Sequence, residues 1–208
     1  FLLRSPQFPN TLSLFKYAEQ EQAVFDLDMY SIFNIFEQIR HYSHLLQEHL
    51  LFINVFPSTL LDASFMYSLD RLLTFSEIKP ENIVLEMNET EREIELPALK
   101  HVSEQLRKKK IKFSLDDLGT GNSTLQALLE LDPDIIKVDR YFCTDLSRCK
   151  KKQALIEFLV NFIRNGSTLI LEGFETEQDL QTAKSLGVSY GQGFYMGIPK
   201  RLDEYLIV

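Results

Sequence analysis

The sequence is poor in the features that mark several large classes of protein. It has only two cysteines, Cys143 and Cys149, separated by five residues. These are too few for a disulfide framework, and their spacing fits no zinc site. No apolar run approaches the length of a membrane span, and no signal peptide is visible. We therefore expect two reduced thiols in a cytoplasmic protein, with no membrane contact from this segment.

Positive charge is also scarce. The chain has 22 lysines and arginines against 30 acidic residues, for a formal net charge of -8. This balance argues against binding a nucleic acid polymer through its phosphate backbone, but it leaves room for a small anionic ligand held by metal ions. With 208 residues, of which 45% are hydrophobic, the chain is expected to form a single soluble domain, residues 1–208, with a sizeable core.

Short apolar runs alternate with longer amphipathic stretches. The predicted strands are Leu51–Asn54, Ile83–Glu86, Ile111–Asp116, Asp134–Asp139, Thr168–Glu172 and Gly193–Met196, with "FLLR" at the start as the end of one more. The predicted helices are Leu27–Leu51, Leu60–Leu73, Glu93–Lys110, Thr124–Leu131, Lys151–Arg164 and Glu177–Leu186. Strand and helix alternating in this way predict a parallel α/β sheet. No GxGxxG follows the first strand, so a dinucleotide site has no support.

Polar side chains stand at the end of nearly every predicted strand. They are Asn54, Glu86, Asp116 with Asp117, Lys137 with Asp139, Glu172, and Gln192 just before the last strand. A doubly wound sheet concentrates its site at one switch point, whereas a (β/α)8 barrel builds its site from many strand ends. The pattern therefore favours an α/β fold of the (β/α)8 TIM-like barrel type. Seven strands including the first fragment leave one missing, and we expect it upstream of Phe1.

These strand ends suggest a chemistry. An amide oxygen and three carboxylates form an all-oxygen set, which suits Mg²⁺ or Mn²⁺; the set is Asn54, Glu86, Asp116 and Asp117. Adjacent aspartates could serve two ions, and two metals about 3.5–4 Å apart clamp the oxygens of a phosphoryl displacement. The glycines of "DDLGTG" would let the next loop fold over the site.

Each residue also has a plainer interpretation. The "DDLGTG" stretch is, on its own, a common solvated turn, and a lone strand lysine such as Lys137 usually extends to solvent at an edge. Glu172 before Gly173 could be a turn residue or a helix cap, and Asn54 could cap the helix that follows. The succession of one polar group per strand end is what favours the functional interpretation.

Seven stretches in order resemble the EAL domain family of cyclic di-GMP phosphodiesterases. "FLLR" resembles the tail of the ExLxR signature, "INVFPSTL" the NxSP-like segment, and "LEMNETE" the ExTE segment. "FSLDDLGTGNSTL" resembles DDFGxGxSxL, "DIIKVDRYF" resembles DxIKxD, "LEGFET" resembles EGVE, and "YGQGFYMGIP" resembles the QGxxxxxP close. Together they span nearly the whole chain.

The resemblance implies a (β/α)8 TIM-like barrel of EAL type that hydrolyses cyclic di-GMP to pGpG in bacterial second-messenger signalling, with two Mg²⁺ or Mn²⁺ ions and a possible homodimer. It makes Asn54, Glu86, Asp116 and Asp117 metal ligands. Glu172 resembles the carboxylate that activates water, Lys137 the cation that orients it, and Glu89 the glutamate that steadies the loop after the aspartates. By the same resemblance Arg4, Asp139, Glu175 and Gln192 contact the substrate or support the pocket.

The chain departs from the family pattern in three places. The glutamate of ExLxR, normally a metal ligand, would precede Phe1, so the first strand is expected to be missing from this chain. Leu118 and Asn122 replace the usual Phe and Tyr of the loop, and Asn88 replaces the usual Thr. No ligand position within the chain is lost, which favours an active phosphodiesterase; the alternative is a catalytically weak or inactive cyclic di-GMP receptor or scaffold.

Overall fold

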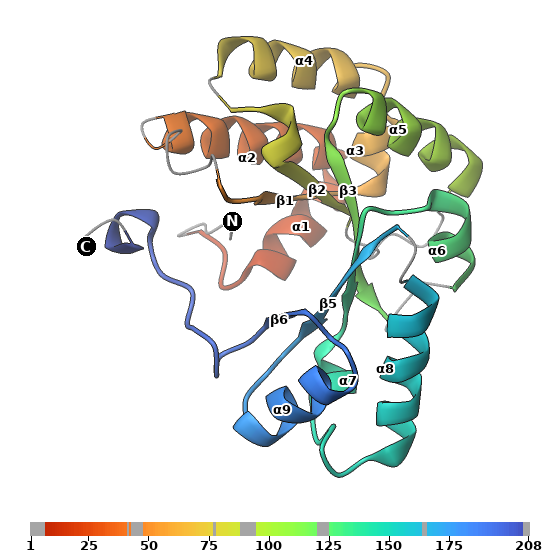
Figure 1. The fold of residues 1–208 in the computed structure, drawn as a ribbon. Helices are drawn as coiled ribbons and strands as arrows, with labels where there is room; N and C mark the ends of the chain where they lie inside the picture. The colour runs from red at the N-terminus through yellow and green to blue at the C-terminus, as the bar shows by residue number, and fades with distance from the viewer. Residues whose placement is uncertain are drawn as a thin grey trace. The chain divides into compact units, whose positions relative to one another are not determined.

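The computed structural model describes residues 7–40, 42, 48–76, 78–87, 95–119, 125–163 and 166–205 (Figure 1). The chain divides into two compact units. Unit 1 consists of residues 1–116 and 121–134, and unit 2 consists of residues 117–120 and 135–208. The first boundary falls between Asp116 and Asp117, so the peptide bond between the two aspartates joins the units.

Three parallel strands run through unit 1. They are β1 (Leu51–Val55), β2 (Ile83–Met87) and β3 (Lys112–Leu118), whose last two residues belong to unit 2. All five residues of β2 are buried, as expected for a parallel strand covered on both faces. The register places Asn54 beside Glu86, and Glu86 beside Ser114.

The helices of unit 1 lie beside these strands (Figure 1). They are α1 (Thr11–Gln20), α2 (Val24–Ile39), α3 (Pro57–Leu61), α4 (Phe65–Phe75), α5 (Leu96–Lys108) and α6 (Leu125–Leu131), with a 3-10 turn, η2, at Pro80–Asn82. Buried Asp28 of α2 accepts a 2.8 Å hydrogen bond from the backbone N–H of Phe56, the N-cap residue of α3. Among the described residues, no helix combines the length and apolar character needed to cross a bilayer.

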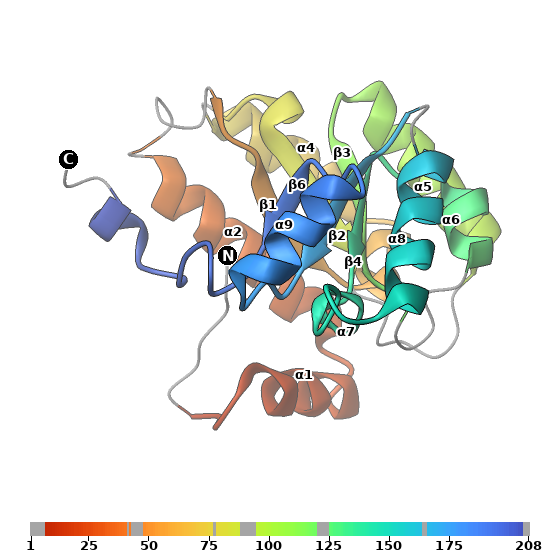
Figure 2. The same cartoon turned by 60° about the horizontal axis from the view of Figure 1, so that its bottom comes forward.

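Unit 2 contains the other three strands, which are also parallel to one another. They are β4 (Ile135–Val138), β5 (Thr168–Glu172) and β6 (Tyr190–Gln192). Its helices are α7 (Arg140–Cys143), α8 (Lys150–Ile163) and α9 (Glu177–Ser185), followed by the 3-10 turn η3 at Leu202–Tyr205. Figure 2 shows α7, α8 and α9 grouped around β4 to β6.

Five of the six strands predicted within the described residues are confirmed, with shifts of at most two residues at their ends. The sixth prediction, Gly193–Met196, is wrong. That segment is a bend and a turn, in which the N–H of Met196 donates to the carbonyl of Gly193, and the strand is Tyr190–Gln192. Phe194 is 69% exposed, so the apolar run that suggested a strand lies at the surface. The "FLLR" fragment lies outside the described residues.

The predicted helices needed larger corrections. The stretch Leu27–Leu51 is not one helix, because α2 ends at Ile39 and Leu51 begins β1. The stretch Leu60–Leu73 contains parts of two helices. Asp62 separates them, because its side chain accepts hydrogen bonds from both the backbone N–H and the hydroxyl of Ser64. These bonds also lower the pKa of Asp62. Two helices, α1 and the four-residue α7, were not predicted.

Candidate metal centre

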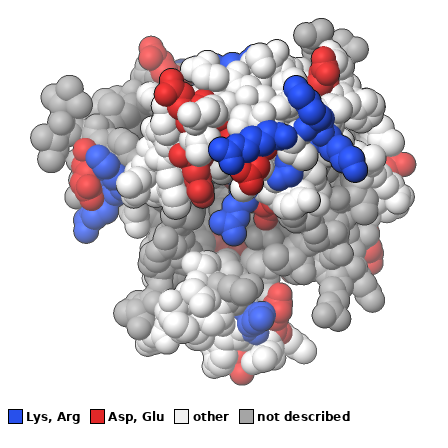
Figure 3. Space-filling view, turned by 90° about the horizontal axis from the view of Figure 1, so that it is seen from below, with Lys and Arg blue, Asp and Glu red and all other residues white. Residues whose placement is uncertain are grey.

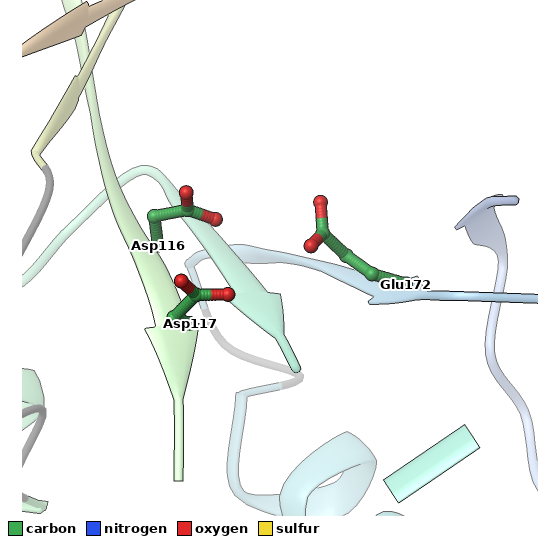
Figure 4. A group of neighbouring side chains, drawn as sticks. All are labelled: Asp116, Asp117 and Glu172. Carbon is green, nitrogen blue, oxygen red and sulfur yellow. The ribbon is translucent and has the colours of Figure 1, made fainter. Parts of the chain in front are cut away.

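Three carboxylates lie together at the ends of β3 and β5. Each of Asp116, Asp117 and Glu172 offers an oxygen, and these oxygens all lie within 4.8 Å of one another. Figure 4 shows the side chains of the two aspartates and Glu172 directed toward one another. Like charges at this separation repel, so a group of three needs a positive partner such as a cation or a lysine.

The backbone turns sharply after the two aspartates and packs there against α7 of unit 2. Asp117 has φ 53°, in the left-handed region that Asp tolerates better than most residues, and Gly119 follows with φ 101°. A Cβ at Gly119 would lie only 2.3 Å from Cε2 of Phe142, in α7. Gly119 is therefore required both by the turn and by the close approach of the Phe142 ring.

Glu172 is presented in a similar way. It is the last residue of β5, and Gly173 follows with φ 82°. A Cβ at Gly173 would lie 2.3 Å from Cβ of Arg140, again in α7. The short helix α7 thus packs against the glycines that follow both Asp117 and Glu172, and it fixes where the chain turns away after each acid.

Lys137 supplies a positive charge next to this cluster. It lies in the middle of β4, only 6% exposed, and its Nζ is 2.5 Å from Oε1 of Glu172. The interpretation of Lys137 as an edge lysine that extends to solvent is therefore wrong, and so is that of Glu172 as a helix cap. A buried ion pair at a strand end is costly to desolvate and is typical of a functional site.

A second group of oxygen donors lies within unit 1. Asn54 is adjacent to Glu86 in the strand register, and Glu86 is only 5% exposed although it is a carboxylate. Next to Glu86 in register is Ser114, whose fully buried hydroxyl has no hydrogen-bond partner among the described residues. Asp116 follows two residues later and therefore shares the face of Ser114. Asn54 does not cap the next helix, because Phe56 is the N-cap residue of α3.

These residues fit a divalent metal. The donors are carboxylate and amide oxygens, which hard cations prefer, and the cluster of Asp116, Asp117 and Glu172 is compact enough for its members to share an ion. The orphaned hydroxyl of Ser114 is a further polar group for which a bound ion or its ligands would provide a partner.

The other predicted site residues are placed as follows. Asp139 is the N-cap residue of α7 and accepts a 2.8 Å hydrogen bond from the N–H of Tyr141. Gln192 is exposed and lies opposite Glu172 in the β5–β6 register. Glu175 is exposed on the segment between β5 and α9. Arg4 and Glu89 lie outside the described residues, as do Asn88 and Asn122.

Two features of the site were missed by the sequence reasoning. Nothing in the sequence singles out Ser114, because a serine in a strand is ordinary until its burial is known. The packing of α7 against Gly119 and Gly173 was also missed. The two glycines were a usable signal, because each follows a candidate site residue by one or two positions. Asp139, two residues before an aromatic pair, was a second signal, because an aspartate often caps a short helix.

Basic residues do not form one continuous patch among the described residues on the face shown in Figure 3. In Figure 3 the lysine and arginine side chains of the described residues are interspersed with acidic ones. Such a mixed surface agrees with the net charge of -8 and offers no extended stripe for a phosphate backbone on the face shown.

Comparison with known proteins identifies relatives across nearly the whole chain. The profile of the EAL domain matches residues 4–199. The probable cyclic di-GMP phosphodiesterase PdeI of Escherichia coli K12 is 32% identical over 161 residues, which is 76% of this chain and 20% of PdeI. The probable cyclic di-GMP phosphodiesterase PdeA of the same strain is 29% identical over 153 residues, 73% of this chain and 21% of PdeA. The chain thus spans about a fifth of the length of these relatives.

Solved structures give the same result. Klebsiella pneumoniae BlrP1, in a complex with calcium and cyclic di-GMP, is 29% identical with a TM-score of 0.82, over 93% of this chain and 49% of BlrP1. BlrP1 has a manganese and cyclic di-GMP complex as well. The EAL domain of Xanthomonas citri FimX, at 18% identity and a TM-score of 0.84, covers 96% of this chain and shares its fold. The similarity confirms the predicted fold class, the α/β TIM-like barrel of EAL type, and the chain belongs to the EAL domain family.

Proposed function

We propose that this chain hydrolyses cyclic di-GMP to linear pGpG with two divalent cations, Mg²⁺ or Mn²⁺. The observation that carries the proposal is the carboxylate cluster of Asp116, Asp117 and Glu172, with buried Lys137 paired to Glu172 at 2.5 Å. The names of PdeA and PdeI support the reaction. The BlrP1 complexes support the ligand and a divalent metal.

The residues divide into two sets of metal ligands. Asn54, Glu86 and Asp116 would hold one ion from unit 1, and Asp117 would hold the other from unit 2. Because Asp116 and Asp117 are consecutive residues, this pair could serve both ions. Divalent cations supply positive charge that polarises the scissile phosphate and favours ionisation of the attacking water.

The protein residues position the reactants and handle the proton. Water forms a new bond to phosphorus while the bond from phosphorus to one ribose 3′-oxygen breaks, and that oxygen finally takes up a proton to give pGpG. Glu172 accepts the proton of the attacking water. Lys137 holds the carboxylate of Glu172 in one orientation through their ion pair, and its charge also stabilises the negative charge that builds up on the phosphate.

The remaining predicted residues would act on the substrate and the loops. Gln192, which lies opposite Glu172 in the strand register, would contact a nucleotide bound over that strand end. Asp139 and Glu175 would support the pocket, Arg4 would contact substrate, and Glu89 would steady the loop after the aspartates. We also propose that residues 1–208 act as one catalytic domain, as a homodimer, in the bacterial cytoplasm, where a nucleotide second messenger is available.

The test is an assay of pGpG production from cyclic di-GMP by chromatography, with Mn²⁺, Mg²⁺ or Ca²⁺ and with excess chelator. We expect turnover with Mn²⁺ and Mg²⁺ only, because Ca²⁺ prefers longer and looser coordination. Glu172→Gln should reduce turnover by about 10²–10⁴-fold, the usual worth of general-base assistance. Glu177→Gln, at an exposed position of α9, is the matched control and should keep the parent rate.

Three outcomes would contradict the proposal. Full activity in excess chelator, or a parent rate in Glu172→Gln, would remove the metal or the base from the mechanism. No hydrolysis under any condition, combined with calorimetric binding of cyclic di-GMP in Ca²⁺, would show that the chain is a receptor instead.

A further inference from the structure

Helices α2 and α4 of unit 1 line a cleft, and none of the residues assigned to the metal centre belongs to its lining. Its volume is about 470 Å³, within the range of about 300–1,000 Å³ that is usual for small-molecule sites. The α2 side contributes residues three to four positions apart, and so does the α4 side, so each helix turns one face to the cleft. The lining includes Phe33, Phe36, Arg40, Tyr67, Arg71 and Phe75.

Aromatic rings dominate this lining. Phe36 is 4% exposed and forms the floor, whereas Phe33, Tyr67 and Phe75 are 48%, 66% and 75% exposed. Large apolar side chains gathered around a concavity are unfavourable in water, and in soluble proteins such a patch marks a binding site. Rings on opposite helices suit a flat aromatic ligand, which stacks on one ring and meets the edge of another.

The cleft lining also contains three charged side chains, those of Glu37, Arg40 and Arg71. Within the described part of the chain, neither Arg40 nor Arg71 makes an ion pair or a side-chain hydrogen bond, and both are exposed. Glu37, one turn before Arg40 on the same face, is likewise unpaired there. Two guanidinium groups in one cleft favour a phosphate or carboxylate, and the carboxylate of Glu37 in the same lining favours a ligand with N–H donors.

We propose that this cleft binds a guanine mononucleotide. A guanine ring would stack among the aromatic side chains, its phosphate would pair with Arg40 and Arg71, and its N1–H and exocyclic amine would donate to Glu37. Adenine offers an acceptor at N1, which Glu37 would repel. An apolar helical partner would leave Glu37, Arg40 and Arg71 without polar partners, whereas a guanine mononucleotide offers a group to each of them. The inference does not depend on the proposed phosphodiesterase activity.

Isothermal titration calorimetry of the full chain with GMP tests the proposal. The titration is made in EDTA, so that any binding that requires metal at the carboxylate cluster is suppressed. GMP should bind at least about tenfold more tightly than AMP, guanosine or inorganic phosphate, because AMP and guanosine each lack one of the three contacts and phosphate lacks two. The variant Asp117→Asn should bind GMP as the parent does, which separates the cleft from the metal centre.

Three variants locate the binding. The double variant Arg40→Gln/Arg71→Gln and the single variant Phe75→Ser should each weaken GMP binding by about tenfold or more. Lys108→Gln removes an exposed cation of α5 that makes no ion pair with any described residue, and it should leave the affinity unchanged. The altered residues are exposed, so circular dichroism should show intact folds.

Several results would overturn the proposal. They are the absence of GMP binding at millimolar concentration, equal affinity for guanosine or AMP, and undiminished binding in the arginine double variant. Weakened binding in Asp117→Asn with no effect of the cleft variants would place the nucleotide at the carboxylate cluster instead. If another protein segment fills the cleft, GMP will not bind there and the proposal fails.

Discussion

Lys137 of β4 and Glu172 at the end of β5 form an ion pair. Both partners are largely shielded from water, with side-chain exposures of 8% and 17%. In such surroundings a charge without its partner is costly, so each residue constrains the other. The pair therefore affects both the orientation of the carboxylate and the stability of the strand ends.

Replacing Lys137 with methionine should reduce turnover of cyclic di-GMP by roughly 10²-fold or more, because Glu172 loses the cation that orients it and the phosphate loses a stabilising charge. Steady-state kinetics should show the loss mainly in kcat. Lys151→Met, at an exposed position of α8, is the control and should retain the parent kinetics. A Lys137→Met enzyme with unchanged kcat and a raised KM would limit Lys137 to substrate binding.

The two cysteines should differ sharply in reactivity. Cys143 is fully buried, and burial, together with the nearby negative charges of Asp179 and Glu175, raises its pKa to about 12. Because the thiolate is the reactive form, Cys143 should stay unmodified at pH 8 in the folded protein. Partly exposed Cys149 should react with Ellman's reagent.

Spectrophotometric titration should therefore count one thiol in the native protein and two in guanidinium chloride. The variant Cys149→Ser should show none until it is unfolded. Rapid modification of Cys143 in native Cys149→Ser would mean that α7 opens readily in solution.

At the scale of elements, Asp179 ties the start of α9 to the loop after α7. Its carboxylate accepts a 2.8 Å hydrogen bond from the N–H of Ser147 and another from the hydroxyl of Thr176, the N-cap residue of α9. Burial opposes ionisation of this carboxyl, but the bonds from Ser147 and Thr176 and the charge of Arg148 outweigh it, and the net effect is a lowered pKa.

This lowered pKa gives a pH-dependent contribution to stability. Because the pKa of Asp179 is lower in the folded than in the unfolded chain, the contribution is complete above about pH 4 and is lost as the pH falls through the folded-state pKa. Asp179→Asn should lower the free energy of unfolding at pH 7 by about 1–3 kcal/mol, and the difference from the parent should shrink below pH 3.

Urea unfolding followed by circular dichroism at pH 7 and pH 3 measures this difference. Asp145→Asn is the control, since Asp145 is exposed and its left-handed backbone, φ 55°, suits asparagine. A gap between parent and Asp179→Asn that stays constant with pH would show that the ionised carboxylate is not what stabilises this junction.

Elements were predictable where one local signal was sufficient. Strand β5 was predicted with its observed bounds, Thr168–Glu172, because a β-branched start and an apolar run end at a glycine. Strand β6 was misplaced because "GFYM" is apolar in sequence, while the structure uses Gly193 for a close approach to the backbone of Phe174, where a Cβ would lie 2.2 Å from the Phe174 nitrogen. No sequence pattern reveals such an approach.

The helices show the same limit. Asn10 accepts a hydrogen bond from the N–H of Ser13, and this cap was a readable signal for α1. The end of α2 at Ile39 had no such signal, because the apolar periodicity continues beyond it and no glycine or proline follows. Helix α7 is too short for any periodicity, and its one sequence signal was the capping residue Asp139.

At the scale of the whole molecule, metal binding should stabilise the folded chain. Ligands that bind only the folded state raise its stability by mass action, by about 2.7 kcal/mol at a concentration 100 times the Kd. For a chain of this size that corresponds to a rise in Tm of roughly 5–10 °C. We expect this rise with saturating Mn²⁺ in the parent protein and a much smaller rise in Asp117→Asn.

Differential scanning calorimetry in EDTA and in Mn²⁺ provides the measurement. Asp26→Asn, at an exposed position of α2, should show the parent response to Mn²⁺. An equal Mn²⁺ response in Asp117→Asn would show that the ion binds elsewhere and would contradict the assignment of the carboxylate cluster.

The barrel class could be predicted because polar residues at successive strand ends are visible in sequence. The compactness of the group Asp116, Asp117 and Glu172 could not, because it depends on tertiary distances between strands far apart in the chain. The ion pair of Lys137 with Glu172 and the burial of the Ser114 hydroxyl also depend on tertiary packing, so the sequence could not predict them. The division into two units between the two aspartates also left no trace in composition or linker sequence.

The packing of α7 against Gly119 and Gly173 determines which substitutions this chain should tolerate. In a library of single substitutions scored for enzyme activity, Gly119 and Gly173 should be as intolerant as the acids that they follow, although neither carries a reactive group. Alanine at either position would clash with Phe142 or Arg140. A parallel score for soluble expression should separate loss of catalysis from loss of folding. Glu172→Gln keeps the shape of the side chain and should express normally, whereas a Cβ at Gly173 would clash with Arg140 and should lower expression.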